Sequence, residues 1–75
     1  MKELKINVKN NAQAIVDIVN EASKVNNGIV IKLNHFFVDA TSIVGIFSLD
    51  PSVDWIVSYP EEDIEFENYI KQFAV

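Results

Sequence analysis

The chain has no cysteine among its 75 residues, so neither a disulfide framework nor a thiolate metal site can reinforce it. Its two glycines, Gly28 and Gly45, are too few and too far apart to form a glycine-rich phosphate loop. It has no apolar run near the roughly 20 residues of a membrane span, and its first residues lack the apolar core of a secretory signal. We therefore expect one small cytoplasmic domain, residues 1–75, that is held by its hydrophobic core alone.

Positive charge is also scarce, because six basic residues stand against eleven acidic ones and give a formal net charge of −5. Contact with nucleic acid usually requires the opposite balance, so nucleic acid is not an expected partner. The composition is 49% hydrophobic and 23% charged, which is typical of a globular domain rather than a disordered one.

Candidate catalytic and metal-binding groups are few. The one histidine, His35, follows Asn34 between two apolar runs, which indicates a solvated hairpin turn rather than a catalyst or a metal ligand. An acidic cluster near the C-terminus lacks the loop glycine and alternating ligands of a calcium site, and we interpret it as the solvated start of a helix. Its members are Glu61, Glu62, Asp63, Glu65 and Glu67. We expect no enzyme activity, no cofactor and no metal.

Hydrophobic periodicity predicts the elements of the first half. Leu4, Ile6 and Val8 alternate with polar residues, as in a strand with one buried face. Asn10 or Asn11 can cap a helix that ends near Asn26-Asn27-Gly28. The apolar stripe predicted for this helix is Ala12, Ile15, Val16, Val19 and Ala22.

The second half begins with a predicted β-hairpin, in which residues 29–33 and 36–38 are joined by a short turn. A short helix starting near Ser42 and stopped by Asp50-Pro51 follows. The predicted fourth strand is Val53, Trp55, Val57 and Tyr59, and the predicted inward stripe of a last helix is Phe66, Tyr69, Ile70 and Phe73. The order βαββαβα predicts an α+β open-faced sandwich, with three helices on one face of a four-stranded antiparallel sheet.

The segment 41–49 carries the most information. Ser42 stands directly before a short apolar run, as helix caps do, because its hydroxyl oxygen can accept from free backbone N–H groups. Ile43, Val44 and Phe47 share one side of the helix, while Ile46 and Leu49 point to another. Such a helix is either buried on both sides or offers one of them to a partner.

The run from Ser42 to Leu49 consists of a serine, two apolar residues, Gly45, two more residues and Ser-Leu. This pattern resembles the regulatory-serine region of HPr, the histidine-containing phosphocarrier of bacterial sugar phosphotransferase systems. Ala22-Ser23-Lys24 is similar to the end of that family's first helix, with no gap between the two matches. The resemblance covers about residues 4–73, and it implies the same open-faced sandwich.

The same register places the family's phosphorylated histidine at Asn11, its arginine at Gln13 and its proline at Ala14. A carboxamide nitrogen is not a nucleophile at neutral pH, whereas an imidazole can accept and pass on a phosphoryl group. The resemblance therefore implies a domain without the carrier chemistry, similar in this respect to the catabolite-repression HPr homologue, in which the serine persists.

Two interpretations of the short helix remain open. Ser42 is either a helix cap only, or a cap that also accepts phosphate from a kinase, as the resemblance implies. Ile43, Val44 and Phe47 either complete the core or bind protein partners, and Ala12 and Ala14 could extend that surface.

Our functional hypothesis is a non-catalytic HPr-like interaction domain, with HPr kinase or a transcriptional or metabolic regulator as its partner. The alternative is a scaffold that self-associates through the short helix. The expected oligomeric state of the chain is a monomer or a weak homodimer. A third hypothesis, a carrier that uses His35, ranks below both.

Overall fold

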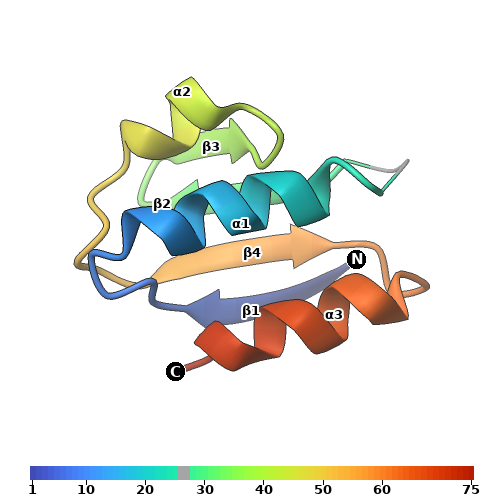
Figure 1. Cartoon of the computed structure of the whole chain (residues 1–75). Coiled ribbons are helices and arrows are strands. Elements are labelled where there is room, and N and C mark those ends of the chain that lie inside the picture. The colour runs from blue at the N-terminus through green and yellow to red at the C-terminus, as the bar shows by residue number, and fades with distance from the viewer. Residues whose placement is uncertain (26–27) are drawn as a thin grey trace.

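The computed structural model describes residues 1–25 and 28–75. These residues form four strands and three α-helices, followed by a 3-10 turn (Figure 1). The elements are β1 (Lys2–Ile6), α1 (Ala12–Ala22), β2 (Val30–Leu33), β3 (Phe36–Asp39), α2 (Ile43–Phe47), β4 (Trp55–Tyr59), α3 (Ile64–Ile70) and η1 (Lys71–Phe73). The predicted order βαββαβα is confirmed.

The sheet is antiparallel, with the strand order β1-β4-β2-β3, and the helices cover one of its faces (Figure 1). β4 lies in the middle, where Val57 pairs with Leu4 of β1 on one side and with Ile31 of β2 on the other. β2 and β3 form a hairpin whose closing pair is Leu33 and Phe36. The α+β open-faced sandwich is thus confirmed, and β1 and β3 are its two edges.

The core lies between the sheet and the helices, and Trp55 is its largest fully buried side chain. The indole N–H of Trp55 donates to the backbone carbonyl of Asp50 at 2.9 Å, so its polar group is satisfied inside the fold. Phe66 and Ile70 of α3 are buried, and Tyr69 and Phe73 pack against the core from its border. These placements confirm the predictions for Trp55 and for the last helix.

The predicted stripe of α1 needs a correction. Ile15, Val19 and Ala22 are buried as expected, but Ala12 is exposed and Val16 is only partly buried. The stripe instead includes two residues that periodicity left out, Ala14 and Ile18. The buried face is rotated because α1 packs against α2 on one flank and against α3 on the other.

The predicted fourth strand begins two residues too early. Val53 lies in a bend and is 39% exposed, and β4 begins only at Trp55. Trp55 pairs with Ile6, the last residue of β1, so no strand remains to pair with Val53. β1 likewise ends before Val8, although the Val8 side chain is buried.

The helix ends also differ from the prediction. α1 ends at Ala22 with Ser23 as its C-cap, and the expected stop at Asn26-Asn27 lies outside the described residues. α2 ends at Phe47 with Ser48 as its C-cap, before the expected stop at Asp50-Pro51. The last helix was expected to start at Pro60-Glu61-Glu62-Asp63, but α3 starts at Ile64 with Asp63 as its N-cap, and the acidic residues of its first turn are Glu65 and Glu67.

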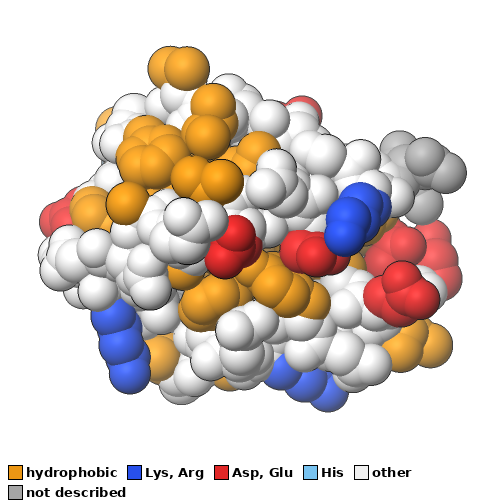
Figure 2. Space-filling model, viewed as in Figure 1, with side chains coloured by type: hydrophobic (Ala, Val, Ile, Leu, Met, Phe, Trp, Pro, Cys, Tyr) orange, Lys and Arg blue, Asp and Glu red, His pale blue; other side chains and the backbone are white. Residues whose placement is uncertain are grey.

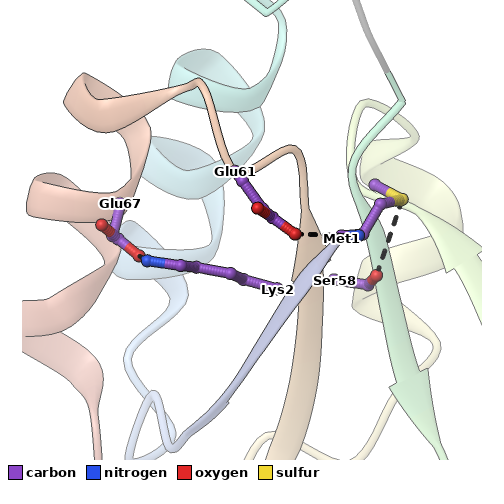
Figure 3. Close-up of polar contacts among 5 residues, drawn as sticks. All are labelled: Met1, Lys2, Ser58, Glu61 and Glu67. Carbon is purple, nitrogen blue, oxygen red and sulfur yellow. Dashed lines mark hydrogen bonds and ion pairs between the residues drawn. The ribbon is translucent and has the colours of Figure 1, made fainter.

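Polar contacts join the N-terminal strand to α3 and to the turn before it. Lys2 reaches from β1 to Glu67 of α3 at 3.0 Å, and the Met1 amino group lies 3.7 Å from Glu61 (Figure 3). The Tyr59 hydroxyl donates to the same Glu67 carboxylate at 2.6 Å. This hydrogen bond, followed by the one from Lys2, lowers the pKa of Glu67, while burial raises the pKa of Tyr59 to about 12.

Within residues 1–25 and 28–75, no helix is long and apolar enough to cross a bilayer. The same residues form no group of three or more histidine, cysteine or acidic side chains that could hold a metal ion.

Candidate functional site

Asn11, where the resemblance places the carrier histidine, is the N-cap of α1. Its side-chain oxygen accepts from the backbone N–H of Ala14 at 3.2 Å, and its backbone is extended. The loop before it turns through Lys9 and Asn10, both with positive φ, and the Asn10 N–H donates to the carbonyl of Pro51 at 3.0 Å. The Asn11 side chain is exposed, so it combines a structural role with access to solvent.

Gln13, where the resemblance places an arginine, lies exposed on the first turn of α1. Its amide nitrogen donates to the Asp17 carboxylate at 3.0 Å, one helical turn further along. The residue therefore brings no cation to the start of α1, and its polar group is held along the helix.

Ser42 is the N-cap of α2, as predicted. Its hydroxyl oxygen accepts from the backbone N–H of Gly45 at 3.2 Å, and its own N–H donates to the carbonyl of Asp39 at 2.9 Å. The Asp39 carboxylate accepts from the N–H and the hydroxyl of Thr41, and these hydrogen bonds lower the pKa of Asp39. A tight polar turn thus presents an exposed hydroxyl at the start of α2.

Gly45 allows α2 to approach β3 closely. A Cβ atom built on Gly45 would lie 2.7 Å from Cγ1 of Val38 and 3.1 Å from the Ser42 hydroxyl oxygen. Any larger residue would push α2 away from the sheet or disturb the Ser42 cap. The glycine in the resembling segment therefore has a packing reason in this chain.

One side of α2 is buried and the other is exposed. Ile46 and, just beyond the helix, Leu49 are buried, whereas Ile43, Val44 and Phe47 are 42%, 81% and 48% exposed. We call these last three residues the α2 surface. In Figure 2 hydrophobic side chains form a patch over α2, and acidic side chains lie over α1 next to it. The interpretation that all three residues complete the core is therefore wrong.

The start of α1 extends this surface only in part. α1 and α2 pack against each other, and Ala12, on the first turn of α1, is exposed. Ala14 is buried, so it cannot contribute to a surface, contrary to the expectation from sequence. The candidate residues that are exposed are thus Asn11 and Ala12 at the start of α1, and Ser42 and the α2 surface on the helix that packs against it.

His35 lies exposed in the turn between β2 and β3, as predicted. The turn is formed by Asn34, whose φ is 54°, a conformation that asparagine tolerates well.

The exposure of two aromatic residues was not predicted from the sequence. Phe36 and Phe37 of β3 are 64% and 68% exposed, although adjacent residues of a strand point to opposite faces. Val38 faces Gly45 of α2, so the neighbouring Phe37 lies on the face of the sheet that the helices do not cover, while Phe36 shares the face of Val38 on the edge strand β3. The sequence did contain an indication of this exposure, because two neighbouring phenylalanines of one strand cannot both point into the core.

No protein-family model and no curated protein sequence matches the chain. Among solved structures, it is similar to the phosphocarrier protein HPr from Bacillus anthracis str. Ames, with 25% sequence identity and a TM-score of 0.69. The match covers 99% of this chain and 94% of that one. The chain therefore has an HPr-like fold along almost its whole length, and this likeness is to a phosphocarrier protein.

Proposed function

We propose that this chain is a non-catalytic HPr-like interaction domain, which binds protein partners through the α2 surface and does not relay phosphoryl groups through a histidine. The observation that carries the proposal is the division of α2, a helix that packs against α1, into a buried side and an apolar exposed side. Contiguous apolar side chains exposed beside a satisfied core are typical of protein-binding sites.

The absence of carrier chemistry rests on Asn11. Its carboxamide nitrogen is delocalised into the carbonyl and does not attack phosphorus at neutral pH, unlike an imidazole nitrogen. Its oxygen also caps α1 by accepting from the backbone N–H of Ala14, and this structural role explains the presence of asparagine at position 11. Gln13 is engaged with Asp17 and supplies no charge to steady a phosphoryl group.

We expect no phosphoryl transfer when the chain is incubated with enzyme I and labelled phosphoenolpyruvate. An HPr that carries the histidine, treated in parallel, serves as the positive control and should become labelled. Incorporation of acid-labile phosphate into this chain would contradict the proposal and would favour the lower-ranked carrier hypothesis based on the exposed His35.

Phosphorylation of Ser42 is the regulatory part of the proposal. The hydroxyl is exposed and stands at the start of α2, where it already accepts from a backbone N–H. A phosphate would add about −1.5 to −2 charges at this point. Modification would change the electrostatic potential beside Ile43 and Val44 and thereby alter which partner binds.

We expect HPr kinase and ATP to add one phosphate to the chain, at Ser42. Mass spectrometry of the intact chain would show the gain, and Ser42→Ala should abolish it. Ser48→Ala is the matched control, because Ser48 is also exposed but lies at the other end of α2, where its hydroxyl donates to the carbonyl of Gly45. If the wild-type chain gains no phosphate, regulation by phosphorylation of Ser42 is contradicted. Binding of partners through the α2 surface is a separate part of the proposal.

The alternative is an HPr-fold scaffold that uses the α2 surface to bind a second copy of itself and has no phosphotransfer role. The same exposure of Val44 and Phe47 supports it. This alternative requires a dimer that light scattering detects and that Phe47→Glu disrupts, with no effect of HPr kinase.

The partner class and the cytoplasmic location are parts of this proposal. An HPr kinase or a regulator of transcription or metabolism is the partner expected for a domain of this kind, and no cofactor is required.

A further inference from the structure

The two edge strands of the sheet differ in whether another segment pairs with their outer side. The outer side of β1 is covered by the C-terminal residues: Asn7 N–H donates to the carbonyl of Phe73 at 2.9 Å and Val75 N–H donates to that of Lys5 at 3.1 Å. Ile6 and Ala74 form an additional bridge. Within the described part of the chain, no segment pairs with the outer side of β3. An uncovered edge is a template for another strand.

The hydrogen-bond alternation shows which groups this edge offers. Ala40 N–H donates to the carbonyl of Ile29 at 2.9 Å, which makes residues 29 and 40 a hydrogen-bonded pair. Since such pairs alternate along an antiparallel ladder, Phe36 and Val38 bond to β2, and Phe37 and Asp39 direct their backbone groups outward. The Asp39 carbonyl already accepts from Ser42. The available groups are therefore the Phe37 N–H and carbonyl and the Asp39 N–H.

The side chains of β3 do not protect its edge. Natural edge strands commonly carry charged side chains, proline or a bulge, and of these features β3 has only Asp39, its last residue. Phe36 and Phe37 are instead 64% and 68% exposed, and Val38 is only partly buried. The Lys32 ammonium lies 5.9 Å from the centroid of the Phe37 ring and belongs to β2, so it does not block the edge.

We propose that β3 pairs with β3 of a second copy of this chain, in antiparallel register about a two-fold axis at Phe37. The two sheets then form one continuous sheet, and each Phe37 exchanges backbone hydrogen bonds with its counterpart. In this register Phe36 lies opposite Val38 of the second copy, which places the exposed ring against a partly buried apolar neighbour.

The same register is electrostatically complementary. His35 and Asp39 stand two residues before and two residues after Phe37, so each histidine lies opposite an aspartate of the second copy. An imidazole N–H can donate to a carboxylate, and such hydrogen-bonding pairs across antiparallel strands stabilise the pairing. Residues 35–39 place no like charges directly opposite each other, which distinguishes a second copy from an arbitrary strand as the occupant.

This pairing uses a different surface from the proposed partner site. The α2 surface consists of Ile43, Val44 and Phe47, and none of them belongs to β3. Because α2 packs against β3, the two surfaces adjoin, and the variants of Phe37 and Val44 described below separate this dimer from partner binding and from the α2-mediated alternative.

Sedimentation equilibrium of the full chain, from micromolar to millimolar concentration, tests the proposal. We expect the mass to rise from 8.5 kDa toward twice that value. Phe37→Glu and Phe37→Lys should each remain monomeric, with the dissociation constant raised by about tenfold or more, because like charges then face each other across the axis. An equimolar mixture of the two variants should restore dimers containing one copy of each.

Val44→Glu is the matched control, since Val44 is exposed on α2 and does not belong to β3, and it should dimerise like the wild type. Circular dichroism should show all variants folded, because both side chains are exposed in the monomer. A wild-type chain that stays monomeric at millimolar concentration, a dimer that survives Phe37→Glu, or a dimer lost in Val44→Glu would each overturn the proposal.

Discussion

Trp55→Ala is expected to remove a large part of the free energy of unfolding, about 4–6 kcal/mol in total. Trp55 is fully buried at the start of the central strand β4, and truncation of such a side chain costs about 3–5 kcal/mol. It also leaves the Asp50 carbonyl without the indole N–H that it accepts from, a further loss of about 1 kcal/mol. A domain of 75 residues has a total stability of only roughly 4–11 kcal/mol.

Urea denaturation followed by circular dichroism measures this loss. Val53→Ala is the matched control, because Val53 lies two residues earlier and is 39% exposed, and its midpoint should stay near that of the wild type. Equal losses for the two variants would contradict the assignment of Trp55 as the main support of the core.

Ile46→Ala is expected to destabilise the domain by about 2–5 kcal/mol, whereas Val44→Ala, two residues away, should change its stability by less than about 0.5 kcal/mol. Ile46 is fully buried between α2 and the sheet, while Val44 is 81% exposed. Both residues lie inside the same five-residue helix, so helix propensity alone cannot separate them.

The comparison of these two variants also bears on function. If Val44 contributes nothing to the free energy of unfolding, its apolar side chain is unused by the folded monomer and is available to a partner. Thermal and urea denaturation of both variants provide the measurement. A loss at Val44 as large as the loss at Ile46 would show that the α2 surface serves the core and would remove the basis for the proposed interaction.

The caps were predictable because they depend on a few neighbouring residues. Asn11 and Ser42 each accept from a backbone N–H three residues further along the chain, and this geometry is local to the start of any helix. The two sides of α2 were predictable for the same reason, since spacing alone separates Ile46 from Val44. The sequence could not say which side was buried.

Other features needed the packed molecule. Periodicity missed Ala14 and Ile18, because the buried side of α1 depends on α2 and α3 packing beside it. It extended the fourth strand to Val53, because the end of a strand depends on where its partner β1 ends. A pattern within one segment contains no information about the neighbours of that segment.

The sequence by itself determined the order of the elements, the α+β class, the capping residues and the carboxamide at position 11, all of which follow from composition and short-range spacing. Only the tertiary structure decided that Ile43, Val44 and Phe47 stay exposed, that Ala14 is buried, and that β1 is covered while β3 is open. Exposure and edge pairing are properties of segments distant in the chain that come into contact, so they arise only when the sheet and its helices assemble.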